Sequence, residues 1–274
     1  MKKNAWMVAA ALLAVPPVAG AEVVEVDVAA PVAASPATAT EERMPFVNGE
    51  RLVYDVRLLG ITAGSAELRV EDAAGGAWRL HASGRTVGAT DSIFGLRQSA
   101  SCTIDGDTMK PEICLFTSRQ RKGMKRREVR YDHATGDVSE RILEDGKRRQ
   151  KTRNFGDEGI QEALSGLYLL RREFPAVGET MRFRAIRKGK PILVEAEALR
   201  TERISTPAGD FTAMLVDLRI VTKVDKDAAQ HAKVWFTDDD RRIPIRISVD
   251  APVGSLVAEL VSAANTRGGS LARR

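Results

Sequence analysis

The sequence has 274 residues, a formal net charge of +5, two cysteines and three histidines. Two thiols and three scattered imidazoles are too few to indicate a metal site, and no cofactor is expected. The positive charge is concentrated in one segment, because residues 119–153 contain thirteen Lys or Arg and only six Asp or Glu.

Residues 1–21 have the pattern of a secretory signal peptide. Lys2 and Lys3 precede an apolar run over 5–15, and the small residues at 19–21 suit a peptidase site. That run is about half the roughly twenty residues that span a bilayer, which disfavours the alternative of an uncleaved anchor. We therefore expect a periplasmic protein with no transmembrane span in the mature chain. An exported protein is not expected to have a nucleic-acid partner.

Residues 22–44 are rich in Ala, Val and Pro and lack periodicity, which predicts a disordered linker. A single β-rich domain is expected over 45–264, a length that suits one all-β domain. The last residues, 265–274, are expected to form a flexible tail.

Runs of alternating apolar and polar residues fill this domain, and turn residues separate them. The clearest runs are 51–58, 65–71, 181–186, 192–198, 213–222, 232–236, 243–249 and 255–262. They predict an all-β fold: a mainly antiparallel, strongly curved sheet, or an open barrel or β-spiral. A break is expected over 60–64, which begins and ends with glycine.

Residues 159–174 depart from this alternation, because their apolar residues follow helical spacing. Asp157 is the expected N-cap, and Pro175 ends the segment. We expect one central amphipathic helix that packs on the open face of the sheet.

The two cysteines, Cys102 and Cys114, flank the turn residues Asp105-Gly106. In an oxidising compartment this spacing favours a disulfide across a hairpin. The alternative is two small buried residues on adjacent strands.

Four phrases have a family resemblance: NGERLVYDVRLLGITAGSAELRVE, EALSGLYLLRRE, ISTPAGDFTAMLV and KVWFTDDDRRIPIRI. In this order, over roughly residues 46–260, they resemble the secreted bacterial family catalogued as domain of unknown function 3108. The resemblance implies an envelope protein with a curved β architecture and brings no catalytic residues. A looser similarity to periplasmic half-barrel lipid and lipoprotein carriers implies a helix that covers an apolar concavity.

Large apolar side chains suggest two interpretations. They form the core, or some of them line a cavity for an acyl chain. The candidate lining residues are Tyr54, Trp78, Leu164, Leu167, Tyr168, Trp235 and Phe236.

The basic segment also has two interpretations. Residues 147–154 have no apolar residue on either face, which is typical of a solvated edge strand. The alternative is a cationic β-hairpin that binds an anionic surface or partner. Its candidate residues are Lys125, Arg126, Arg127, Arg130, Arg148, Arg149, Lys151 and Arg153.

Catalytic motifs such as GxSxG, HExxH and SxxK are absent from the sequence, and the three histidines are far apart. The three aspartates at 238–240 are followed by two arginines, which favours a charged turn over a calcium loop. We therefore expect a non-enzymatic envelope protein that binds a lipid or other amphiphile and an anionic surface. A structural or adaptor protein that binds a partner protein or peptidoglycan is the alternative, and an enzyme acting on envelope polymers is the third hypothesis.

Overall fold

The computed structural model describes residues 44–121, 123–156, 159–187, 189–222, 225–251 and 254–272. The predicted signal peptide and almost all of the predicted linker lie outside these residues. The first half contains β1 (Arg51–Leu58), β2 (Ile61–Asp72), η1 (Ala74–Gly76), β3 (Trp78–Thr86), α2 (Gly88–Phe94), β4 (Arg97–Ile104), β5 (Pro111–Gln120), β6 (Gly123–Asp132), β7 (Asp137–Glu144) and β8 (Lys147–Asn154). The second half contains α3 (Ala163–Arg172), β9 (Thr180–Arg187), β10 (Lys190–Thr206), β11 (Gly209–Thr222), β12 (Asp225–Thr237), β13 (Pro244–Ala251), β14 (Gly254–Thr266) and β15 (Gly269–Ala272).

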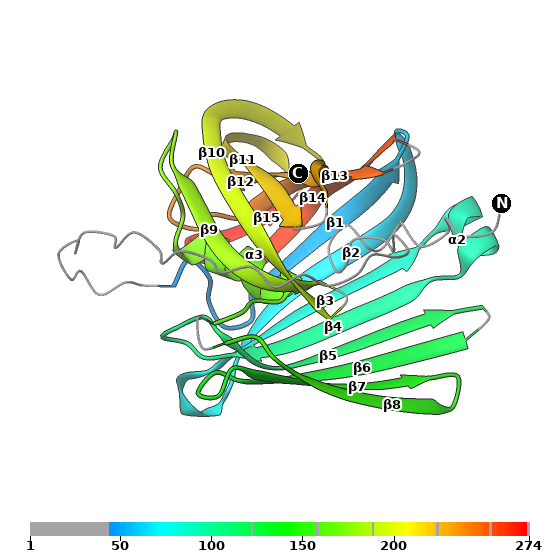
Figure 1. Ribbon diagram of the computed structural model, residues 1–274. Coiled ribbons are helices and arrows are strands. Elements are labelled where there is room, and N and C mark those ends of the chain that lie inside the picture. The colour runs from blue at the N-terminus through cyan, green and yellow to red at the C-terminus, as the bar shows by residue number, and fades with distance from the viewer. Residues whose placement is uncertain are drawn as a thin grey trace.

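The described strands form one antiparallel sheet built from two meanders. The strand order is β8-β7-β6-β5-β4-β3-β2-β1-β14-β13-β12-β11-β10-β9, and β15 pairs with β14. The meanders meet in the middle, where β1 pairs with β14. Figure 1 shows β1–β8 as a broad slab and the strands from β9 to β12 curling over it. The curved, open, all-β fold predicted from the alternating runs is therefore confirmed.

The core lies on one face of this sheet, as the period-two patterns require. In β1, Leu52, Tyr54 and Val56 are buried while their neighbours are more exposed. The same alternation places Leu68 and Val70 of β2 in the hydrophobic core. Within the described residues, no helix is long and apolar enough to cross a membrane.

Helix α3 packs inside the curve of the sheet, against β3, β4 and β9. Its Arg171 is fully buried and donates two hydrogen bonds to the carboxylate of Glu50, of 2.6 and 3.0 Å. The same guanidinium donates to the carbonyl oxygen of Arg241 at 2.9 Å. One side chain therefore ties the helix both to the segment before β1 and to the β12–β13 connection.

The expected central helix is present, but its start differs from the prediction. Its N-cap is Glu162, which forms a capping box with Ser165. Asp157, the expected cap, lies outside the described residues. Asp is the better cap by residue type, but Glu162 is also held by a partner on the sheet, as described below.

The structure departs from the expectations at three further points. A second helix, α2, is present; its seven residues are too few to show a helical period. The expected break over 60–64 is strand from Ile61 onward, because Leu59 and Gly60, both with positive φ, complete a two-residue turn. The expected tail continues β14 to Thr266 and then pairs as β15, so the sheet extends almost to the end of the chain.

Candidate anion-binding site

The candidate cations lie on strands β6 and β8 of the free edge of the sheet, here called the basic sheet (β5–β8). Val129 and Val138 are buried, which defines the core face of these strands. Strand register then assigns Lys125, Arg127, Arg149, Lys151 and Arg153 to the core face and Arg126, Arg130 and Arg148 to the outer face. The predicted patch is thus divided between two surfaces.

Arg127 on the core face is a structural residue. Its guanidinium donates to the carboxylate of Glu162 at 2.8 Å and lies 4.1 Å from the centre of the Phe116 ring. Burial raises the pKa of Glu162, and the nearby Arg127 opposes that shift. The pair therefore joins β6 to the N-terminus of α3, and Arg127 is not available as a free anion site.

Other cations of the patch are neutralised locally. Lys125 lies 3.5 Å from Glu144, which also contacts Arg149. Arg130 donates to Glu128 at 2.7 Å. These are exposed pairs, in which each charge partly satisfies the other.

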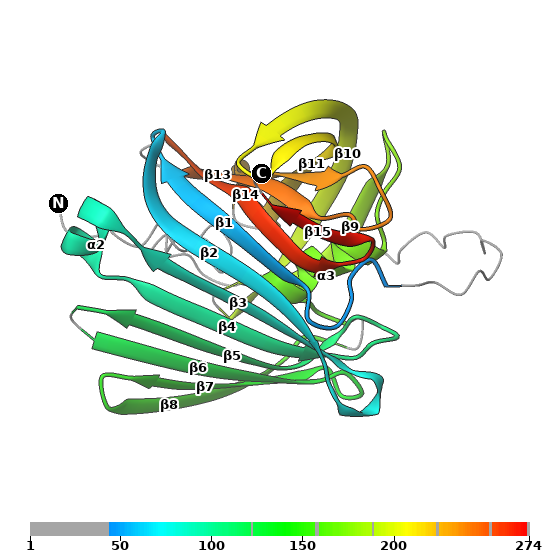
Figure 2. The same ribbon diagram turned by 180° about the vertical axis from the view of Figure 1, so that it is seen from behind.

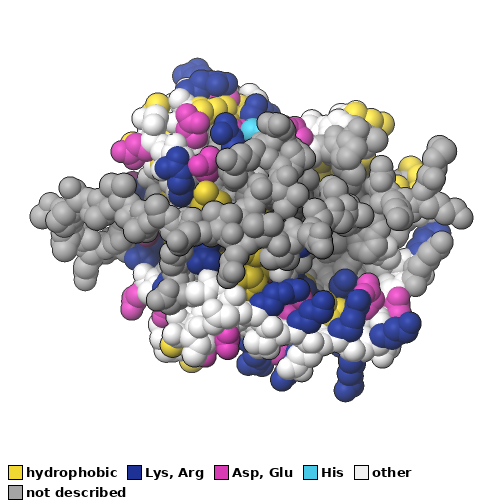
Figure 3. All heavy atoms as spheres, in the orientation of Figure 1, with side chains coloured by type: hydrophobic (Ala, Val, Ile, Leu, Met, Phe, Trp, Pro, Cys, Tyr) yellow, Lys and Arg dark blue, Asp and Glu magenta, His cyan; other side chains and the backbone are white. Residues whose placement is uncertain are grey.

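Four cations of the patch have no ion pair with another described residue: Arg126, Arg148, Lys151 and Arg153. Arg126 and Arg148 lie in one cross-strand row, on either side of Leu143. An apolar side chain between two unpaired guanidinium groups suits an anion that carries a hydrocarbon group. Figure 3 shows Lys and Arg side chains gathered over these strands.

A groove of about 650 Å³ lies along the basic sheet. It is lined by three consecutive cross-strand rows: Leu115, Glu128, Arg141 and Gln150; Phe116, Arg127, Ile142 and Arg149; and Thr117, Arg126, Leu143 and Arg148. The first and third rows point to the outer face, so we assign the groove to that face. On that face the groove presents the side chains of three arginines, Arg126, Arg141 and Arg148, and of two leucines, Leu115 and Leu143.

The predicted ligand-lining residues lie elsewhere. Tyr54, Leu164, Tyr168 and Phe236 are buried in the core, and Trp78, Leu167 and Trp235 pack against it. None of them lines the groove. Their role in lining an acyl-chain cavity stays a prediction, and their packing in this structure is that of a core.

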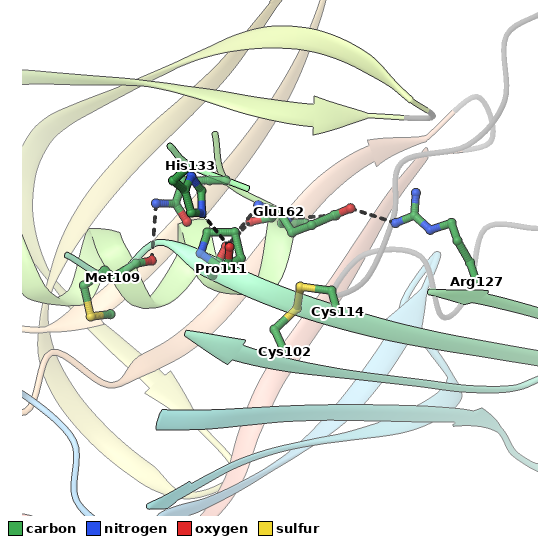
Figure 4. Close-up of a disulfide and its surroundings, with 10 residues drawn as sticks. Cys102, Met109, Pro111, Cys114, Arg127, His133 and Glu162 are labelled. Carbon is green, nitrogen blue, oxygen red and sulfur yellow. Dashed lines mark hydrogen bonds and ion pairs between the residues drawn. A yellow bond between two sulfur atoms is a disulfide. The ribbon is translucent and has the colours of Figure 1, made fainter. Parts of the chain in front are cut away.

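The predicted disulfide is present at the base of the basic sheet. Cys102 of β4 lies directly opposite Cys114 of β5, with Cα atoms 4.1 Å apart. Figure 4 shows this disulfide close to the Arg127–Glu162 pair and to His133, whose Nε2 lies 2.6 Å from the carbonyl oxygen of Pro111. These contacts fix the start of the basic sheet to the rest of the fold.

The histidines are not brought together. His81 lies 3.2 Å from Glu71, His133 contacts Pro111, and His231 lies 3.6 Å from Asp217. In the part of the chain that the structure describes, no group of three or more His, Cys, Asp or Glu side chains could hold a metal ion.

The acidic turn at 238–240 is held by the chain itself. Asp239 accepts hydrogen bonds from Thr237 Oγ1 and from the backbone and guanidinium of Arg241. Its oxygens therefore stabilise the β12–β13 turn.

Sequence reasoning did not identify Leu115, Arg141, Ile142 or Leu143 as site residues. Their positions depend on the register of four strands, and register is not visible in a single run of sequence. The only local pattern that could have pointed to Arg141, Ile142 and Leu143 is the alternation of polar and apolar residues within 137–143.

The family described as "Protein of unknown function (DUF3108)" matches residues 53–261, which covers most of the chain and both meanders. The chain belongs to the DUF3108 family. No curated protein matches it. Membership in DUF3108 assigns no ligand and no reaction.

One solved structure has a fold similar to that of this DUF3108 protein. A β-barrel-like protein of the DUF1849 family from Brucella abortus aligns with a TM-score of 0.54 and 10% identity, over 79% of this chain and 97% of that one. A chain from Bacteroides fragilis, provisionally described as an exported protein with a YmcC-like fold, aligns with a TM-score of 0.32 and 13% identity, over 79% and 96%. The first similarity supports the fold alone, and the second is too weak to carry an argument.

Proposed function

We propose that this protein is a non-enzymatic protein of the cell envelope that binds an anionic amphiphile on the outer face of the basic sheet. The observation that carries the proposal is the row Arg126–Leu143–Arg148 within the groove of about 650 Å³. Two guanidinium groups without an ion pair among the described residues suit an acidic headgroup, and Leu143 between them and Leu115 in the same groove suit a hydrocarbon chain.

The N-terminal sequence supports the proposed location. Residues 1–21 have the features of an export signal, and in the periplasm the abundant anionic amphiphiles are lipids. The proposed ligand class is therefore a lipid with an acidic headgroup, bound without chemical conversion.

Binding of monomeric lysophosphatidylglycerol, measured by calorimetry below its micelle concentration, tests this proposal. The matched pair of variants is Arg126→Gln with Arg148→Gln, against Arg79→Gln with Arg203→Gln. Arg79 and Arg203 are also exposed and have no ion pair among the described residues. We expect the first pair to weaken binding about tenfold or more, and the second to change it less than about twofold.

Lysophosphatidylcholine and raised salt provide the second arm of the test. The zwitterionic lipid should bind more weakly, and salt should weaken the anionic ligand because the contacts are exposed and screened. Equal affinity of both variants for lysophosphatidylglycerol, or no binding by the unaltered protein, would refute the amphiphile site.

The edge strand β8 favours a second candidate function, that of an adaptor. All eight residues of β8 are exposed, and among the described strands it pairs only with β7. An extended acidic segment of a partner protein could add to such an edge through backbone hydrogen bonds. A peptide of alternating Glu and Val should then bind, and Lys151→Glu with Arg153→Glu should abolish that binding while lysophosphatidylglycerol binding persists.

A further inference from the structure

Exposed aliphatic side chains gather at one end of the sheet. Leu59, Ile61 and Ile93 are 68%, 71% and 67% exposed, and Met124 is 38% exposed. They are four of the six large hydrophobic side chains that are exposed in the described part of the chain. We refer to these four residues as the apolar tips.

The topology explains why the apolar tips lie together. In an antiparallel meander, every second connection lies at the same end of the sheet. The β1–β2 turn carries Leu59 and Ile61, α2 between β3 and β4 carries Ile93, and Met124 follows the β5–β6 turn. Figures 1 and 2 both show these connections along one side of the molecule. Five strand spacings separate β1 from β6, about 24 Å in total.

The turn residues at this end are unusual for a solvated hairpin. Leu59 has a φ of 51°, a conformation that two-residue hairpin turns usually give to Asn, Asp or Gly. A leucine here gains little burial within the fold and adds backbone strain. Contact with an apolar phase outside the protein would account for an exposed Leu59 followed two positions later by an exposed Ile61.

Helix α2 is held firmly enough to present Ile93. Asp91 accepts a hydrogen bond from Thr86 Oγ1 at 2.7 Å and two from the guanidinium of Arg97. The backbone N–H of Val87 donates to the carbonyl oxygen of Ala63 in β2, beside Ile61. The helix and the β1–β2 turn are therefore parts of one surface.

A row of arginines lies directly behind the apolar tips. Arg85, Arg97 and Arg119 occupy one register row across β3, β4 and β5, and Met124 continues that row on β6. All three arginines are exposed. Like charges opposite each other on adjacent strands are unfavourable. Within the described residues Asp91 is the one acid that pairs with this row, so an external anion would relieve the repulsion.

We propose that this end of the sheet docks on the surface of an anionic lipid bilayer. The apolar tips enter the headgroup region, and the arginine row contacts the acidic headgroups. Aliphatic side chains at the end of the sheet suit the apolar boundary of a bilayer, and arginines directly behind them suit its acidic headgroups. The inference goes beyond the proposed function and does not depend on it, because no apolar tip lines the groove.

The test uses protein purified from the periplasm of an expression host, with its N-terminus determined. Binding is measured by flotation with vesicles of phosphatidylcholine and phosphatidylglycerol in a 3:1 ratio, and with vesicles of phosphatidylcholine alone. The tip variant is Leu59→Ser, Ile61→Ser and Ile93→Ser. The matched control is Val177→Ser, an exposed aliphatic position among the described residues that belongs neither to the apolar tips nor to the groove.

We expect the tip variant to lose binding to the anionic vesicles about tenfold or more, and the control to stay within about twofold of the unaltered protein. Arg85→Gln with Arg119→Gln should remove the preference for phosphatidylglycerol. Unchanged binding by the tip variant would overturn the proposal. Each variant should unfold at the same temperature as the unaltered protein. A loss of vesicle binding then comes from the changed surface and not from a damaged fold.

A label measures insertion directly. The described residues contain no free cysteine, so Ile61→Cys can carry an environment-sensitive NBD group. Its emission should shift to the blue when anionic vesicles are added, and no shift would contradict insertion.

A dimer that forms without lipid and is lost in the tip variant would instead assign the apolar tips to a second copy of this chain. Lysophosphatidylglycerol binding should be the same in the tip variant and the unaltered protein, so failure of the groove and failure of the docking surface give different results.

Discussion

Arg171 and Glu50 form an ion pair in which both side chains are fully buried. The guanidinium also donates to the carbonyl oxygen of Arg241, and its positive charge lies 5.1 Å from the centre of the Tyr168 ring. Burying two charges is costly unless each is the partner of the other. The pair therefore holds α3 in place only while both partners remain.

We predict that Arg171→Met lowers the free energy of unfolding by about 3–5 kcal/mol, because it leaves Glu50 buried without a counter-charge. The double variant with Glu50→Gln should recover part of that loss. Urea unfolding of the four proteins of the cycle measures the coupling. The exposed pair Arg51–Glu67 is the control, and Arg51→Met should cost less than about 1 kcal/mol. Equal costs for the two pairs would contradict the structural role of Arg171.

Removal of the disulfide should destabilise the fold without altering its topology. Cys102 and Cys114 are separated by 12 positions, and a loop of this length corresponds to about 2–3 kcal/mol. The double variant Cys102→Ala, Cys114→Ala should unfold at lower urea concentration by this amount. Unfolding of the unaltered protein in reducing agent should give the same midpoint as the variant. If reduction has no effect, the disulfide does not contribute to stability.

Gly136 should not tolerate a side chain. Its φ is +75°, and a Cβ at this position would lie 2.3 Å from the backbone oxygen of Gly156. Gly136→Ala should therefore cost at least about 2 kcal/mol, from strain and from displaced backbone. Gly146, at the β7–β8 turn, is the matched control, because its φ is +80° and nothing lies within 4 Å. Gly146→Ala should cost only about 1 kcal/mol, and thermal unfolding compares the two.

Asp91 should stabilise α2 down to acidic pH. Hydrogen bonds from Arg97 and then from Thr86 lower the pKa of Asp91 from 3.8 to about 2. A depressed folded-state pKa means that the stabilisation is fully present above pH 3.8 and disappears as pH falls through about 2. The difference in stability between the unaltered protein and Asp91→Asn, measured from pH 6 to pH 2, should be constant at first and then vanish. If the two proteins are equally stable at pH 6, these hydrogen bonds do not stabilise the fold.

Sequence alone predicts those features that depend on neighbouring residues. Alternation located β1 and the strands of the second meander, and helical spacing located α3. Cys102 and Cys114 could be paired because a short turn joins their strands. Helix α2 was not predicted because its seven residues are too few to show a helical period.

Features that depend on distant residues could not be predicted. Arg126 and Arg148 flank Leu143 only because three strands adopt one register. Arg171 lies in the last turn of α3, where a cation is favourable in any helix, so its sequence position gives no hint of its partner Glu50, 121 positions earlier. Equally, nothing in the local sequence distinguishes Arg127, which pairs with Glu162, from Arg126 beside it, which has no ion pair with another described residue.

The junction between the two meanders has a consequence for how the chain folds. Leu52 of β1 lies opposite Ala263 of β14, so the middle of the sheet joins residues from the two ends of the domain. Such non-local pairing slows folding, because a large loop must close before the contact is made. The centre of the sheet therefore cannot form until nearly the whole chain is available. The first meander, β1–β8, pairs only strands that are neighbours in sequence and can form early, so the last strands to be synthesised complete the sheet at its centre.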